Sequence, residues 1–136
     1  MKSIFFVLIL ILELCSDEGY ELKLYQSLFP ALFQKERLIV YSQEAEQITI
    51  FKNSTSIKLS NNCNDADLII GKDFEDLPNI CDNKPIFATS YRSFTETQNA
   101  FGAFYWSKGR PQIQFKSEAI KKFHLKLPEN LQRYSK

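Results

Sequence analysis

Apolar residues in the first part of the chain recur at the spacing of an amphipathic helix. In residues 20–36 (YELKLYQSLFPALFQKE) they fall at i, i+3, i+6, i+7, i+10 and i+11, counted from Leu22. This spacing collects them on one side of an α-helix. Pro30 lies inside the run, and because proline has no N–H to donate we expect a kink there or a helix in two pieces.

Short apolar runs of strand length follow this helix. Four of them are residues 37–42 (RLIVYS), 56–60 (SIKLS), 66–72 (ADLIIGK) and 84–90 (KPIFATS). Most are rich in β-branched and aromatic residues, which is typical of strands, and the early ones have the pattern of strands buried on both faces. Parallel pairing is therefore expected there. Residues 44–53 (EAEQITIFKN) fit either a helix or a strand.

Two further segments carry the signals of helix starts. Asp73 has the side chain of a helix N-terminus, and Pro78 and Asn79 would end that helix early. Residues 117–123 (SEAIKKF) predict a helix with Ser117 as N-cap and with an acidic residue, Glu118, in its first turn.

Residues 102–115 (GAFYWSKGRPQIQF) predict a β-hairpin at the edge of the sheet. Gly109 supplies the permissive backbone of a tight turn, and the flanking segments alternate as strands do. We expect four side chains to face the core: Phe104, Trp106, Ile113 and Phe115.

Three other residues of this hairpin are candidates for binding a protein partner. Tyr105 points away from Phe104 and Trp106 in a strand, and Lys108 and Arg110 lie at the turn. Tyrosine and arginine are enriched among the residues that dominate binding energy at protein interfaces. The alternative is that this face merely covers the edge of the sheet.

Together these elements predict a single α/β (α+β) domain with a mixed β-sheet, flanking helices, and a C-terminal β-hairpin followed by a helix. A chain of 136 residues allows one domain. Its net charge of +1 gives no indication of nucleic acid or an anionic membrane as partner, and 4 glycines argue against a glycine-rich phosphate loop.

The N-terminus has the pattern of a secretory signal peptide. Lys2 precedes the apolar residues 4–12 (IFFVLILIL), which are too few to span a bilayer comfortably. We expect cleavage after Ser16, so that residues 1–16 are the signal and residues 17–136 form the domain, outside the cytoplasm. Lipidation at Cys15 is disfavoured by the large Leu14 before it, although a lipidated or an uncleaved N-terminus stays open.

Two cysteines, Cys63 and Cys81, remain after cleavage. In an oxidising compartment two cysteines most often pair, and a loop of this length would add roughly 3 kcal/mol of stability. Two buried free thiols are the alternative. A metal site is not indicated, because the single His124 has no C-x-x-C motif to join.

No catalytic constellation stands out, so the chain is not expected to be an enzyme or to hold a cofactor. His124 lies in a strand-like segment without a nearby acid, which favours a structural role. The remaining candidate is an acidic cluster able in principle to serve acid–base chemistry, which makes a hydrolase the last-ranked hypothesis. The cluster consists of Asp65, Asp67, Asp73, Glu75 and Asp76.

The order of elements in the second half resembles the YfiR-like family of small periplasmic regulators. A Gly-led strand, a turn, an I-x-F strand, a helix and a leucine-rich tail occur in the same order. The matching positions are Gly102, Ile113, Phe115, Ala119, Leu125, Leu127 and Leu131. The chain departs from the family in lacking a Trp near Pro30, in its aromatic and charged YWSKGRP turn, and in cysteines that do not align with the family's disulfides.

The resemblance implies a periplasmic protein that binds the periplasmic part of a membrane-bound diguanylate cyclase and holds it inactive. Release by redox or envelope stress would raise cyclic-di-GMP and promote biofilm. Cys63 and Cys81 would then stabilise the repressing conformation or sense redox state. The main alternative is a small-ligand-binding periplasmic protein related to one lobe of a solute-binding fold, with the aromatic cluster stacking on the ligand. A homodimer stays open.

Overall fold

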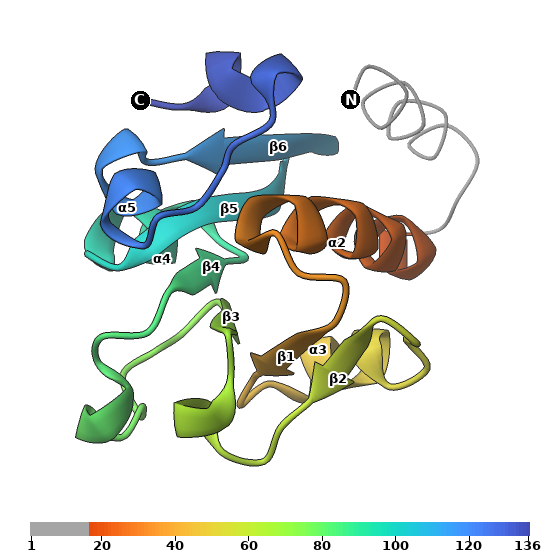
Figure 1. Cartoon of the computed structure of the whole chain (residues 1–136). Helices are drawn as coiled ribbons and strands as arrows, with labels where there is room; N and C mark the ends of the chain where they lie inside the picture. The colour runs from red at the N-terminus through yellow and green to blue at the C-terminus, as the bar shows by residue number, and fades with distance from the viewer. Residues whose placement is uncertain (1–16) are drawn as a thin grey trace.

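A computed structural model describes residues 17–136, and the expected signal peptide, its cleavage site and Cys15 lie outside them. The first described helix is α2 (Asp17–Phe33), and the last element is the 3₁₀ helix η3 (Glu129–Tyr134). Figure 1 shows the sheet extending from β1 and β2, side by side in its lower part, to β6 at the top. The other elements are β1 (Leu38–Tyr41), α3 (Ala45–Phe51), β2 (Ile57–Leu59), η1 (Cys63–Asp65), β3 (Leu68–Gly71), η2 (Asn79–Cys81), β4 (Ile86–Ala88), α4 (Tyr91–Glu96), β5 (Ala100–Ser107), β6 (Arg110–Phe115) and α5 (Ser117–Lys122).

The six strands form one mixed sheet in the order β2-β1-β3-β4-β5-β6. All neighbouring pairs are parallel except β5 and β6, which form the antiparallel hairpin. The predicted α/β class, the parallel early strands and the C-terminal hairpin are therefore confirmed. Every residue of β3 and β4 is buried, which explains why these strands are apolar throughout.

Both faces of the sheet are covered, and we name them after one helix each. On the α2 face, the core joins the sheet to α2, α3 and α5, with the rings of Tyr25 and Phe29 stacked at 5.0 Å. On the α4 face, a smaller core joins the sheet to α4 and to the two cysteine-bearing 3₁₀ helices. Ile69 and Ala103 lie in this second core.

Two predicted helix features differ in detail. A first helix in two pieces is wrong, because α2 is one helix and Pro30 lies in its last turn. The alternative, a kink at Pro30, stays a prediction. The N-cap of α5 is Lys116 rather than Ser117. The Ser117 hydroxyl is instead hydrogen-bonded to the Ser135 hydroxyl at 2.7 Å, so the side chain of Ser117 is used to hold the C-terminal tail.

No helix begins at Asp73. After β3 the chain forms bends and a turn, and the next regular element is the 3₁₀ helix η2 (Asn79–Cys81). The N–H groups of Lys72 and Asp73 are bonded to the Glu44 carboxylate, which fixes this segment as a loop. His124 is also not in a strand: it is exposed and has a φ of 55° just past the end of α5, a position of the left-handed region.

Candidate functional site

The β5–β6 hairpin ends in a tight turn that projects its basic residues. Lys108 and Gly109 have φ values of 52° and 75°, and a two-residue hairpin turn with both central residues at positive φ matches the twist of the strands. Ser107 pairs with Arg110, and Trp106 pairs with Pro111. Pro111 is tolerated because β6 is the edge strand of the sheet. Gly109 therefore has the turn role that the sequence predicts.

One side of the hairpin belongs to the α2 face. Phe104 is buried against Tyr20, with ring centroids 5.4 Å apart, and Trp106 packs edge-on against the same Tyr20 at 6.3 Å. Trp106 faces the predicted side but stays 38% exposed, because Tyr20 lies in the first turns of α2 and covers only part of the indole. Of the four expected core residues, Phe104 and Phe115 are fully buried, whereas Ile113 is half-buried.

The other side of the hairpin belongs to the α4 face and holds the predicted partner-binding residues. The ring of Tyr105 packs against that of Tyr91, with centroids 5.9 Å apart and planes at 62°. The amide of Gln114 donates to the Tyr105 hydroxyl at 3.0 Å. Burial raises the pKa of Tyr105, Tyr91 adds to this rise, and the hydrogen bond from Gln114 opposes it. Tyr91 itself is 57% exposed.

Arg110 lies on the same side as Tyr105, because it pairs with Ser107, two residues further along β5. Lys108 and Arg110 are exposed, and neither is in an ion pair within residues 17–136. The hairpin end thus brings Tyr105, Lys108 and Arg110 together. Sequence reasoning missed Tyr91, whose place after the N-cap Ser90 at the start of a short helix was the only available signal.

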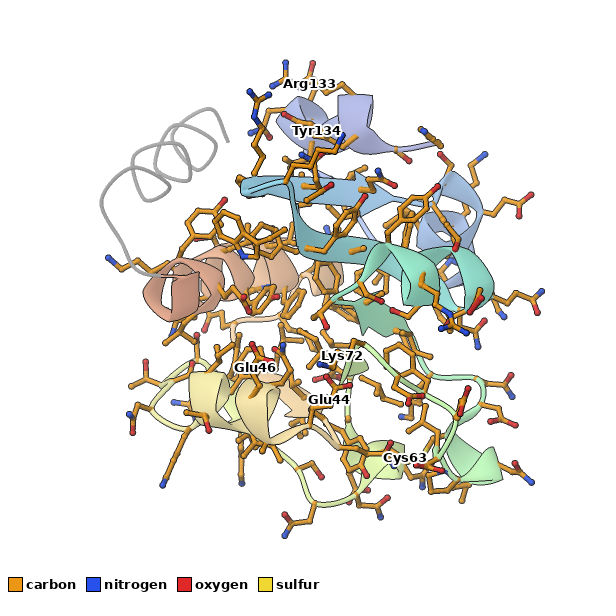
Figure 2. All side chains as sticks on the ribbon, turned by 180° about the vertical axis from the view of Figure 1, so that it is seen from behind. Glu44, Glu46, Cys63, Lys72, Arg133 and Tyr134 are labelled. Carbon is orange, nitrogen blue, oxygen red and sulfur yellow. A yellow bond between two sulfur atoms is a disulfide. The ribbon has the colours of Figure 1, made fainter. Side chains whose placement is uncertain are left out.

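A second candidate site lies where the strand order reverses, at the carboxyl ends of β1 and β3. Ligands of open parallel sheets bind in the crevice at such a switch point. Here Oε2 of Glu44 accepts the N–H groups of Lys72 at 2.6 Å and Asp73 at 3.2 Å. Figure 2 shows Glu44 and Lys72 side by side, with Glu46 of α3 nearby. The carboxylate of the protein itself therefore satisfies the backbone donors of this crevice.

We call the two hydrogen bonds from Lys72 and Asp73 to the Glu44 carboxylate the Glu44 clasp. A cleft of about 490 Å³ lies next to the Glu44 clasp, between the loop after β3 and α4. Its charges are mixed: Lys72 and Arg92 oppose Asp73, Glu75 and Glu96. Arg92 and Glu96 form an ion pair at 3.2 Å, which reduces the charge that a ligand would meet. The other lining residues are Phe74, Ser93, Thr97 and Gln98.

The acidic cluster of the sequence is divided by the fold. Asp65 and Asp67 precede β3, whereas the other three carboxylates follow it, so a strand of roughly 13 Å separates the two groups. Asp67 is fully engaged: Oδ1 contacts Nζ of Lys35 at 2.7 Å, and Oδ2 accepts the N–H of Ile39 at 2.9 Å. Within residues 17–136 no group of three or more His, Cys, Asp or Glu side chains could hold a metal ion.

The two cysteines form a disulfide, as predicted. Cys63 of η1 and Cys81 of η2 have Cα atoms 6.0 Å apart and are 3% and 0% exposed. The bond joins the segments that lead into β3 and β4, on the α4 face of the sheet. Cys63 is labelled in Figure 2 at the end of the molecule opposite the hairpin.

No protein-family model matches the chain, and neither a curated protein nor a solved structure matches it. None of the helices in residues 17–136 is long and apolar enough to cross a membrane.

Proposed function

We propose that the protein is a periplasmic regulatory binding protein that represses a membrane-bound diguanylate cyclase by protein–protein contact. The observation that carries the proposal is the exposed end of the hairpin on its α4 face. There, Tyr91 and Tyr105 form an aromatic pair on the same side of the hairpin as Arg110, which is in no ion pair within residues 17–136. Tyrosine and arginine are, with tryptophan, the side chains most enriched among those that dominate binding at protein interfaces.

The rigidity of this surface supports the same proposal. Tyr105 is held by the Gln114 hydrogen bond and by the antiparallel pairing of β5 with β6, and Tyr91 begins a helix capped by Ser90. Side chains that are already ordered lose less conformational entropy on binding. The choice of a cyclase as the partner comes from the resemblance to the YfiR-like family, and the N-terminal signal pattern and the disulfide are in keeping with the periplasm.

A cellular assay tests the proposal. The chain is produced in a bacterium together with a candidate membrane-bound diguanylate cyclase, and cyclic-di-GMP is measured. Wild-type protein is expected to lower cyclic-di-GMP, and the double variant Tyr91→Ala/Tyr105→Ala is expected to lose this effect at an equal periplasmic level. Lys52→Ala/Lys58→Ala, which alters exposed residues at the β2 end of the sheet, is the matched control. Unchanged repression by the tyrosine variant would count against this surface.

The cleft beside α4 supports a second candidate function, the binding of a small periplasmic ligand. Its volume of about 490 Å³ is within the range of small-molecule sites. A panel of small metabolites screened by thermal shift tests this function. A ligand whose stabilising effect disappears in Arg92→Ala supports it, and flat melting curves across the panel argue against it.

A further inference from the structure

The end of the hairpin carries a second set of residues, which joins the α2 face to the two basic residues of the turn and does not include the Tyr91–Tyr105 pair. Trp106 packs on Tyr20, and Tyr134 packs against the same core cluster to which Tyr20 belongs. Arg133 donates to the Tyr134 hydroxyl at 2.8 Å and lies 4.9 Å from its ring. Figure 2 shows Arg133 and Tyr134 beyond the outer edge of β6. We call the following set the hairpin tip surface: the exposed Trp106, Lys108, Arg110 and Arg133, the half-buried Tyr134, and the buried Tyr20 on which Trp106 packs. Arg110 lies on the side of Tyr105 and reaches this surface only as a residue of the turn.

This surface has the composition of a membrane-interface contact. Trp and Tyr side chains are favoured at the level of lipid headgroups, where an apolar ring with one polar group meets both phases. Lys and Arg add attraction to anionic headgroups. Lys108 and Arg110 extend from the turn, and the ion pairs within residues 17–136, Lys35–Asp67 and Arg92–Glu96, involve neither of them. Their charges are thus available to an external anion.

The position of the surface along the chain points to the same partner. Figure 1 shows the hairpin turn and the first turn of α2 at the same end of the molecule. The apolar residues 4–12 end four residues before α2 begins at Asp17. Four residues span at most about 14 Å, so an N-terminus that keeps residues 4–12 in a bilayer would hold this end of the domain at the membrane.

We propose that the hairpin tip surface contacts the headgroup region of a membrane that contains anionic phospholipids. Trp106 lies at the depth of the headgroups, and Lys108 and Arg110 lie against their phosphates. The net charge of +1 does not reveal this surface, because it sums 17 basic and 16 acidic residues over the whole chain. The inference goes beyond the proposed function, since it requires no protein partner, and it leaves the Tyr91–Tyr105 pair on the opposite face of the hairpin.

The single tryptophan makes the contact directly measurable. Trp106 is the only Trp of the chain, so its fluorescence reports this surface alone, even if residues 4–12 also bind lipid. The full chain is titrated with vesicles of phosphatidylcholine, with or without phosphatidylglycerol. We expect a shift of the emission to shorter wavelength, stronger with phosphatidylglycerol and weakened in 1 M salt, where the screening length is about 3 Å. Brominated lipids should quench the emission.

Matched variants identify the residues responsible. Lys108→Ala/Arg110→Ala is expected to raise the lipid concentration at half-maximal shift roughly 30-fold, from the usual contribution of a basic residue near an anionic surface. Lys52→Ala/Lys58→Ala, with the same change of charge at the β2 end, and Tyr91→Ala, on the other face of the hairpin, should leave it unchanged.

Three results would overturn the proposal. The first is an unchanged Trp106 emission with phosphatidylglycerol vesicles, whether or not the chain sediments with them. The second is a loss of binding in Lys52→Ala/Lys58→Ala that equals the loss in Lys108→Ala/Arg110→Ala. The third is an emission shift that appears only when a protein partner is present. None of these results depends on repression of a cyclase, so this proposal and the proposed function fail separately.

Discussion

The contact between Glu44 and Gly71 allows a test of how the loop after β3 is held. Oε2 of Glu44 accepts the two N–H groups of Lys72 and Asp73, directly beyond the end of β3. A Cβ atom added at Gly71 would collide with that same oxygen, so the glycine leaves room for the carboxylate. The alanine variants Glu44→Ala and Gly71→Ala are therefore expected to break the same two hydrogen bonds.

The size of the effect follows from these bonds. Each hydrogen bond to a charged acceptor contributes about 1.5–3 kcal/mol when shielded, but Lys72 and Asp73 are exposed and water can replace the lost acceptor. We therefore expect Glu44→Ala to lower the free energy of unfolding by about 2 kcal/mol, and Glu44→Gln, which keeps an oxygen acceptor, by about half of that. Gly71→Ala should lose about 1–2 kcal/mol, since alanine also restricts the unfolded chain.

Urea unfolding of the two single variants and the double variant measures the coupling. The double variant should be no less stable than Glu44→Ala, because the carboxylate is already absent when the new methyl group arrives. Glu36→Ala, an exposed position in the loop before β1, is the control and should change stability by less than about 0.5 kcal/mol. If the losses of unfolding free energy in the two single variants simply add in the double variant, Glu44 and Gly71 do not act through the same two hydrogen bonds, and this would refute the Glu44 clasp.

Three further predictions concern stability. Reducing the Cys63–Cys81 bond should lower the free energy of unfolding by roughly 3 kcal/mol, seen as a lower urea midpoint with reductant; an equal midpoint would contradict a structural disulfide. Burial raises the pKa of Tyr20 to about 12 and that of Tyr25 well above 10, so the unfolded chain loses its phenolic protons first and stability should fall as pH rises above about 10. Tyr20→Phe should make this fall less steep, and an unaltered slope would refute it. Lys108→Asn should raise the unfolding midpoint slightly, because asparagine tolerates the positive φ of 52° better than lysine does, and a lowered midpoint would refute the turn geometry.

Local pattern was sufficient to predict the hairpin and the strands because their determinants lie close together in the sequence. Gly109 fits the turn by its own conformational freedom, and the apolar runs of β3 and β4 match their burial on both faces. The disulfide was predictable from cysteine number and compartment alone.

The two wrong helix-start predictions arose where a residue far away in the sequence forms a hydrogen bond with the group that was expected to act locally. The Glu44 carboxylate, 28 residues before Lys72, binds the N–H groups that a helix at Asp73 would have left free. Ser135 binds the Ser117 hydroxyl, 18 residues away, that would have capped α5. Long-range partners of this kind leave no periodic signal in the sequence.

Residues 44–53 show how packing decides an ambiguous pattern. Ile48, Thr49 and Ile50 suggest a strand, yet Gln47, Ile50 and Phe51 are buried at i, i+3 and i+4, as on one side of a helix, while Ile48 is exposed. The stacking of Phe51 on Tyr25 at 5.5 Å fixes this choice, and α2 supplies that ring from 26 residues upstream. The candidate site was predictable only in part for a similar reason, since Tyr91 meets Tyr105 through the tertiary fold.

The most direct test of the proposed function is the affinity of the protein for the periplasmic part of a candidate membrane-bound diguanylate cyclase. Isothermal titration should give a measurable dissociation constant for the wild type. Tyr91→Ala/Tyr105→Ala should weaken binding at least tenfold, the equivalent of about 1.4 kcal/mol, while Lys52→Ala/Lys58→Ala should bind like the wild type. No binding by the wild type, with the disulfide either intact or reduced, would contradict the account.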